Sequence, residues 1–166
     1  MNTHSLLIDN VAFAKRDERI VGTLTLEDCK RLADQLQAAE INYTLEGENN
    51  SERYTLTLSL DAKVQATCQR CMSGMPLSLN REFHYLINDA PLSDNEFSDL
   101  EEGDDIDLLE PSQAMDLVAL IEDEMLMALP IAPVHAEDCN DNLHNGVAES
   151  GEKPNPFAVL KGLIKP

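Results

Sequence analysis

The residues best suited to chemistry are four that can ligate a metal ion: Cys68, Cys71, His135 and Cys139. The first two belong to a CxxC motif, which in a tight turn supplies two of the four tetrahedral ligands of Zn²⁺. His135 and Cys139 would complete a Cys₃His set, but 63 residues lie between Cys71 and His135, so only the fold can join the pairs. A CxxC motif without a second close pair is a weak zinc signal. We therefore expect no cofactor and keep zinc at these residues as the minority hypothesis.

The CxxC motif has two other interpretations. A redox motif needs its first cysteine at the N-terminus of a helix, where the dipole lowers the thiol pKa. Here the preceding residues alternate as in a strand, and Gly74 and Pro76 follow, which favours a turn between strands. In the simplest case the cysteines only shape or pack this turn, and Arg70 points to solvent. Cys29 is expected in the core.

Signals for an enzyme are sparse. The sequence has no glycine-rich phosphate loop and no GxSxG or HExxH motif. Its four histidines are scattered, and His84 lies within an expected strand, where a structural role is favoured. Carboxylates are abundant, but abundance does not make a pair with separated pKa values. We expect no catalytic residues, no cofactor-binding residues and no small-molecule substrate.

The net charge of −19 is concentrated in the centre of the chain. Residues 82–152 contain twenty Asp and Glu and no Lys or Arg, whereas residues 1–81 are nearly neutral and residues 153–166 carry three lysines and no acid. Affinity for nucleic acid comes largely from Lys and Arg that displace counterions from phosphates. A cationic protein is therefore the easier partner, unless the charge only maintains solubility. RNA contacts would use the basic minority: Lys15, Arg16, Arg19, Arg70, Lys153, Lys161 and Lys165.

Hydrophobic periodicity predicts an α+β fold. Apolar residues recur at helical spacing over residues 24–38, which indicates a first helix with Thr25 as its N-cap. The period then changes to two, and the alternation indicates strands at 41–45, 54–60, 62–67 and 77–87. Because turn residues join these strands directly, we expect an antiparallel β-meander of about four to five strands.

A second main helix is predicted over residues 113–129. Ser112 is a suitable N-cap, and Pro130 ends the helix. The acidic triplet Glu122-Asp123-Glu124 interrupts its apolar positions, and the turns of one helix cannot hide all three side chains. The triplet is either a solvated face or a site for a basic partner.

The remaining segments divide the chain into a domain and a tail. We expect one α+β domain over residues 1–152, with an acidic loop near 88–105. Residues 153–166 form a basic tail in which Asn155 as N-cap and Pro156 at the first position indicate a short amphipathic helix. A helix this short is marginal in water, so it should dock on the domain or on a partner.

The sequence carries no signal for export or membrane insertion. Met1–Ser5 includes no basic residue, and only Leu6-Leu7-Ile8 follows as an apolar run. The longest apolar run, Met125 to Val134, is ten residues with two prolines, too short and interrupted to span a bilayer. We therefore expect a cytoplasmic protein whose cysteines are reduced or bind metal.

Taken in order, five motifs resemble the YceD family, the large ribosomal RNA subunit accumulation proteins. The motifs are Cys68-Gln69-Arg70-Cys71, Ile106-Asp107-Leu108-Leu109, Glu122-Asp123-Glu124 with Ala128-Leu129-Pro130, Pro133-Val134-His135, and Lys153-Pro154-Asn155-Pro156-Phe157-Ala158-Val159-Leu160. The last motif is the most specific, and the resemblance runs from about residue 55 to the C-terminus. It implies a cytoplasmic protein needed for accumulation or processing of 23S ribosomal RNA, with a role in large-subunit biogenesis and no known enzymatic activity.

Charge and resemblance together predict a non-catalytic assembly factor. It would bind a ribosomal protein or a large-subunit precursor, and it would contact rRNA indirectly or through the basic tail. The candidate partner contacts are Arg70, Glu122, Asp123, Glu124, Lys153, Asn155, Phe157, Lys161 and Lys165. The alternatives are a metal-dependent enzyme acting on ribosomal RNA, or a protein-interaction module unrelated to ribosomes.

Overall fold

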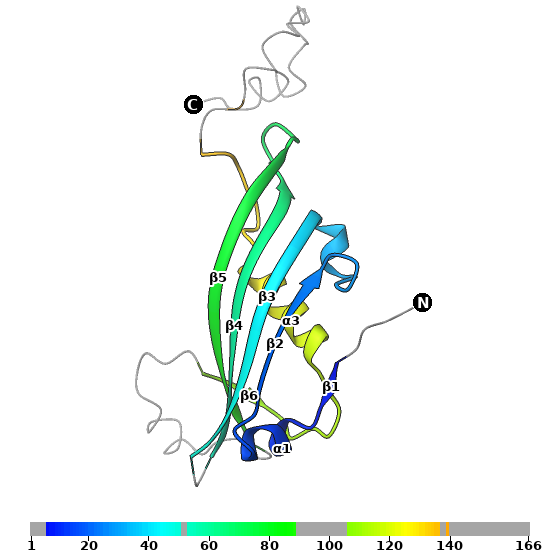
Figure 1. The fold of residues 1–166 in the computed structure, drawn as a ribbon. Coiled ribbons are helices and arrows are strands. Elements are labelled where there is room, and N and C mark those ends of the chain that lie inside the picture. The colour runs from blue at the N-terminus through cyan, green and yellow to red at the C-terminus, as the bar shows by residue number, and fades with distance from the viewer. Residues whose placement is uncertain (1–5, 51–52, 89–105, 137–138, 140–166) are drawn as a thin grey trace, which may run out of the picture.

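The fold is built on one curved five-stranded sheet, seen in a computed structural model that describes residues 6–50, 53–88, 106–136 and 139 (Figure 1). The strand order is β2-β3-β4-β5-β6. The first four strands pair antiparallel, and β6 pairs parallel to β5, so the predicted α+β fold with an antiparallel meander is confirmed for most of the sheet. The bounds are β2 (Arg19–Thr25), β3 (Leu36–Asn49), β4 (Tyr54–Thr67), β5 (Gly74–Ile87) and β6 (Ile106–Leu109).

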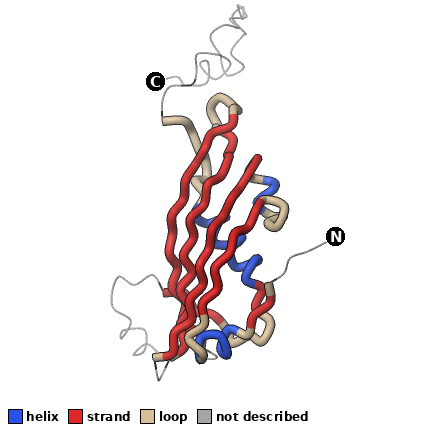
Figure 2. The backbone as a smooth tube through the Cα atoms, viewed as in Figure 1, coloured by secondary structure: helices blue, strands red, loops and turns tan. Residues whose placement is uncertain are grey.

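Alternation along the strands gives the sheet one apolar face. In β4 every second side chain from Leu56 to Ala66 is buried, and the Thr, Ser, Asp, Lys and Gln residues between them are more exposed. The strands predicted at 54–60 and 62–67 are one continuous strand of 14 residues, because the alternation never breaks. Its neighbours β3 and β5 have the same length, and Figure 2 shows the three running side by side.

The helix α3 (Leu117–Ala128) covers the apolar face and confirms the second predicted helix (Figure 1). It buries Leu117, Val118, Ile121 and Met125. The helix begins later than predicted, because Met115–Asp116 form the short strand β7 and Asp116 serves as the N-cap.

The helix predicted over residues 24–38 is wrong. Residues 24 and 25 end β2, a short 3₁₀ helix η1 occupies Leu32–Asp34, and β3 begins at Leu36. Between them Asp28 accepts hydrogen bonds from the backbone N–H and the hydroxyl of Thr25, at 2.8 and 2.9 Å, which closes a turn. Of the apolar residues that suggested a helical face, Cys29 and Leu32 are fully buried, whereas Ala33 is exposed. Their spacing reflects burial and not a helix, because a compact turn can bury the same residues.

Two small elements at the N-terminal end have no predicted counterpart. They are β1 (Leu7–Ile8), which pairs antiparallel with β7, and α1 (Asn10–Lys15), which is capped by Asp9. The fully buried Asn10 side chain donates to the carbonyl of Glu110 at 2.9 Å and accepts from the N–H of Ser112 at 2.8 Å. These bonds tie the N-terminal elements to the segment that leads into α3.

Some predictions concern residues outside the described ranges. These residues include the predicted acidic loop near 88–105, of which only Asn88 is described, and the predicted basic tail at 153–166. The division into domain and tail therefore stays a prediction, as does the C-terminal helix. Among the residues that are described, no helix is long and apolar enough to cross a bilayer.

Candidate metal centre

The first two candidate ligands lie in the turn between β4 and β5. Cys68 follows the last residue of β4, and its N–H donates to the carbonyl of Ser73 at 2.9 Å. The N–H of Met72 donates back to the carbonyl of Cys68 at 2.9 Å. Met72 has a φ of 61°, a left-handed backbone conformation that allows this tight reversal. The predicted turn between strands is confirmed.

The other two ligands come from the segment that follows α3. Pro130 cannot continue the helix, and residues 129–136 run as a loop toward the β4–β5 turn (Figure 1). One backbone bond docks this loop, from the N–H of Gln69 to the carbonyl of Pro133 at 2.8 Å. It brings His135 and Cys139 to the CxxC turn.

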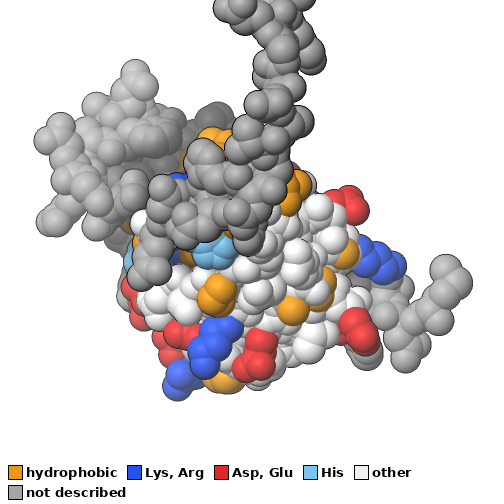
Figure 3. Space-filling view, turned by 90° about the horizontal axis from the view of Figure 1, so that it is seen from above, with side chains coloured by type: hydrophobic (Ala, Val, Ile, Leu, Met, Phe, Trp, Pro, Cys, Tyr) orange, Lys and Arg blue, Asp and Glu red, His pale blue; other side chains and the backbone are white. Residues whose placement is uncertain are grey.

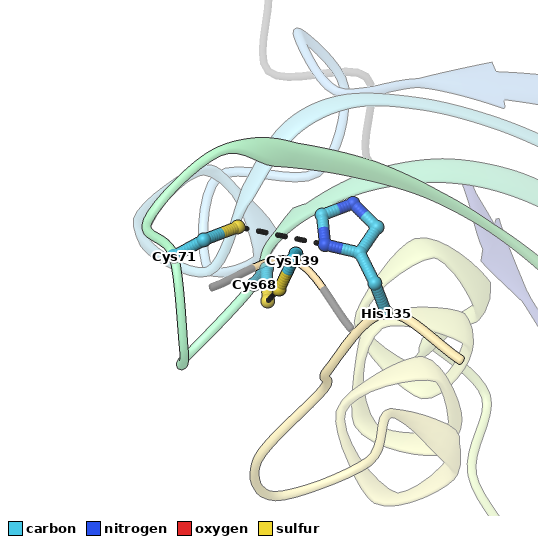
Figure 4. A group of neighbouring side chains, drawn as sticks. All are labelled: Cys68, Cys71, His135 and Cys139. Carbon is cyan, nitrogen blue, oxygen red and sulfur yellow. Dashed lines mark hydrogen bonds between the residues drawn. The ribbon is translucent and has the colours of Figure 1, made fainter. Parts of the chain in front are cut away.

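All four candidate ligands meet in one cluster (Figure 4). Their ligand atoms, three Sγ and one imidazole nitrogen, lie within 4.8 Å of one another. The Sγ atoms of Cys68 and Cys139 are 3.8 Å apart, and the Sγ of Cys71 is 3.5 Å from Nδ1 of His135. Sequence reasoning named these four residues, and the fold supplies the proximity that the sequence could not.

The surroundings of the cluster favour thiolates at two of the cysteines. Burial raises the pKa of the Cys68 thiol, but hydrogen bonds from the backbone of Cys71, Arg70 and His135 outweigh it and lower this pKa to about 5. A backbone hydrogen bond from Ser73 lowers the pKa of Cys71. The thiolate is the form of cysteine that binds a metal. These two cysteines are therefore suited to bind a cation, whereas burial raises the pKa of the third, Cys139.

Arg70 contacts the cluster directly. Its Nε donates to the Sγ of Cys139 at 3.0 Å, and its Nη2 donates to the carbonyl of His135 at 3.3 Å. The guanidinium therefore bridges the turn and the loop, in contrast to the expectation that it points to solvent. Its role as a partner contact stays a prediction.

The three carboxylates of the acidic triplet Glu122-Asp123-Glu124 in α3 do not share one hydrogen-bond partner. Glu122 is buried and accepts from the backbone N–H of Arg31 at 2.7 Å and from its Nε at 3.2 Å. The exposed Asp123 accepts from Nη1 of Arg31 at 2.6 Å. Glu124 accepts from the hydroxyl of Tyr85 at 2.7 Å. Glu122 is therefore not part of a solvated face.

Arg31 is a neighbour of the acidic triplet that sequence reasoning missed. It also donates to the carbonyl of Ala119 at 2.9 Å, so one guanidinium joins three residues of α3 to the turn before η1. Its side-chain hydrogen bonds to Asp123 and Glu122 raise its pKa. The sequence offered no signal for this contact, because the wrong helix prediction at 24–38 concealed the turn that carries Arg31.

The other candidate partner contacts lie in the tail. Lys153, Asn155, Phe157, Lys161 and Lys165 are outside the described residues, so the structure gives them no position. They remain sequence-based candidates.

These features define a class of α+β protein in which a mostly antiparallel sheet is covered by one main helix and a Cys₃His cluster forms at a β-turn. The chain belongs to the YceD family: the model of that family, described as "Large ribosomal RNA subunit accumulation protein YceD", matches residues 56–164. It is 28% identical over 173 residues to a protein of that name from Haemophilus influenzae, covering 95% of this chain and 94% of the relative. No solved structure matches the chain. The resemblance seen in the motifs is confirmed.

Proposed function

We propose that this chain is a non-catalytic cytoplasmic factor in large ribosomal subunit biogenesis that supports accumulation or processing of 23S ribosomal RNA. The observation that carries the proposal is membership in a family whose description names large ribosomal RNA subunit accumulation. The relative from Haemophilus influenzae bears the same name and aligns along almost its whole length. Because the alignment covers both chains nearly end to end, a shared role of the whole protein is supported.

The charge distribution supports binding to a ribosomal protein or a pre-ribosomal particle. The twenty acidic residues of 82–152 repel a bare phosphate backbone and attract cationic proteins. Among the described residues, Glu122 and Asp123 pair with Arg31 within the chain. Contact with rRNA would then be indirect or pass through the lysines of residues 153–166.

The end of the sheet that carries the Cys₃His cluster offers apolar contact area. Met72 in the turn is 69% exposed, and Ile131 and Val134 in the docked loop are 104% and 49% exposed. Seen from this end, apolar side chains lie among charged ones (Figure 3). Apolar patches rimmed by polar residues are typical of protein-binding surfaces, and these three side chains would contribute to such a patch. We therefore place one partner contact at this end.

Affinity purification of the tagged full-length protein at two salt concentrations tests the proposal. We expect ribosomal proteins or large-subunit precursors to be recovered at low salt and lost at high salt, because screening weakens contacts between exposed charges. Recovery of no ribosomal component at either concentration would contradict the proposal and favour an interaction module unrelated to ribosomes. Bound RNA that disappears after removal of bound protein would support an indirect contact.

Deletion of residues 153–166 tests the tail. We expect the shortened protein to lose co-sedimentation with large-subunit precursors, while a variant in which only the exposed Lys63 becomes Ala retains it. Normal co-sedimentation of the shortened protein would remove the tail from the proposal.

The enzymatic alternative has a direct test. Incubation of the purified protein with precursor 23S RNA and Mg²⁺ should leave the RNA intact. Specific cleavage at a defined position would overturn the non-catalytic assignment in favour of a metal-dependent enzyme acting on ribosomal RNA.

A further inference from the structure

We propose that Cys68, Cys71, His135 and Cys139 bind one Zn²⁺ ion, and that the ion clamps the loop after α3 to the β4–β5 turn. Two distances between ligand atoms of the cluster match those expected around this ion, and all four ligand atoms lie within 4.8 Å of one another. A tetrahedral zinc site with Zn–S of about 2.3 Å and Zn–N of about 2.0–2.1 Å has S···S edges of about 3.8 Å and S···N edges of about 3.6 Å. The Cys68–Cys139 separation is 3.8 Å and the Cys71–His135 separation is 3.5 Å.

The donor set selects zinc and a structural role. Three thiolates and one imidazole form a Cys₃His set, which is a frequent ligand set of structural zinc sites. Soft thiolate ligands disfavour Mg²⁺ and Ca²⁺, which take oxygen ligands. With four protein ligands the tetrahedron is closed, so no position is left for a reacting water molecule. The site therefore stabilises the fold and performs no hydrolysis.

The groups around the ligands complete the argument. Zn²⁺ with three thiolates and a neutral imidazole carries one net negative charge, and the guanidinium of Arg70, 3.0 Å from the Sγ of Cys139, offsets it. Backbone N–H groups of the turn donate to the thiolate of Cys68, as outer hydrogen bonds do in metal sites. Both features stabilise charge on sulfur, which an apolar packing role for the cysteines does not require.

The clamp joins parts of the chain that are distant in sequence. Cys71 and His135 are 64 positions apart, and a direct backbone bond between turn and loop runs from the N–H of Gln69 to the carbonyl of Pro133 at 2.8 Å. An ion ligated from both sides adds four bonds at the same place. It also fixes Cys139, the residue from which the chain continues into residues 140–166.

Metal analysis of the full-length protein tests the proposal. The protein is purified with reductant and without chelator, supplied with Zn²⁺, freed of unbound metal, and measured by elemental mass spectrometry. We expect about one zinc per chain. Cys68→Ser and His135→Ala should lose it, whereas the controls Cys29→Ala and His84→Ala, which replace the same residue types outside the cluster, should retain it. Zinc far below one per wild-type chain, or full zinc in both cluster variants, would overturn the proposal.

A second measurement on the wild-type chain avoids variants that fail to fold. Replacement of zinc by Co²⁺ should give the absorption bands of a tetrahedral thiolate site, and added Zn²⁺ should remove them. Bands typical of six oxygen or nitrogen ligands would contradict the proposed ligand set. A disulfide between Cys68 and Cys139 in the protein purified with reductant, detected by mass spectrometry, would contradict it equally.

Hydrogen exchange separates a clamp from a passive site. A chelator should accelerate exchange of the Gln69 amide, which holds the loop, by about tenfold or more, with little change in the middle of α3. An unchanged exchange rate of the Gln69 amide after complete loss of zinc would contradict the proposal that the ion holds the loop to the turn.

Discussion

At the scale of single residues, the contact between Arg31 and Glu122 contributes to stability through a backbone amide. Glu122, which is 7% exposed, accepts from the Arg31 N–H at 2.7 Å, and this donor loses its partner if the carboxylate is removed. Loss of a partly buried hydrogen bond to a charged group costs about 1–3 kcal/mol. We expect Glu122→Ala to lower the free energy of unfolding by this amount in urea titrations. The matched variant Asp123→Ala, which loses an exposed ion pair with the same arginine, should cost less than about 1 kcal/mol. Equal losses would contradict this account.

The buried thiol of Cys29 makes the free energy of unfolding depend on pH in the alkaline range. Burial, followed by the charges of Glu122 and Asp28, raises the pKa of its thiol from 9.0 to about 12. Between these values the unfolded chain loses the thiol proton and the folded chain keeps it. The stability contribution is therefore complete below the unfolded pKa and is lost as pH rises toward the folded value. The test is to measure the free energy of unfolding at several alkaline pH values. In the wild-type protein it should fall as pH rises, and Cys29→Ala should make this fall shallower, by an amount that corresponds to at most one bound proton. An identical slope in both proteins would contradict the assignment.

At the scale of elements, the sequence predicts the strands and helices that have a regular apolar period. It does not predict the turns and clusters whose structure depends on contacts with distant residues. Alternation along residues 54–67 indicates a strand because neighbouring strands accept the same period, and α3 follows from its apolar spacing. The residues before η1 carry helical spacing as well, but α3 and Arg31 select a turn there instead. For the cluster, the ligand types were readable, whereas their proximity depends on α3 crossing the sheet and returning its loop to the β4–β5 turn.

The packing of α1 against β3 also depends on such a distant contact. A Cβ atom added at Gly47 in β3 would lie 2.7 Å from the Cα of Ala14 and 2.9 Å from Cδ1 of Phe13. Because backbone cannot move aside easily, we expect Gly47→Ala to lower the melting temperature and to cost about 1–3 kcal/mol. At Gly74 the nearest atoms are the ends of the Gln65 and Gln37 side chains, so Gly74→Ala should cost less. A larger loss for Gly74→Ala than for Gly47→Ala would contradict this account.

At the scale of the whole molecule, acidic charge is segregated along the chain but partly neutralised in the fold. The nearly neutral residues 1–81 contribute Arg31, which pairs with Glu122 and Asp123 from the acidic residues 82–152. Residues 82–152 hold twenty Asp and Glu, against twelve Lys and Arg in the whole chain, so the chain as a whole is expected to bind cationic partners in a salt-dependent manner.

The central position of β4 in the sheet limits where the protein can be shortened. The family match begins at residue 56, within β4, yet residues 19–49 supply the two strands that flank this strand on one side. A fragment restricted to residues 56–164 would leave a long apolar strand with unpaired N–H and C=O groups, a template for intermolecular pairing. We expect this fragment to form aggregates in size-exclusion chromatography, whereas the 166-residue protein does not. The stretch that the family model matches thus lacks two strands of the sheet to which β4 belongs.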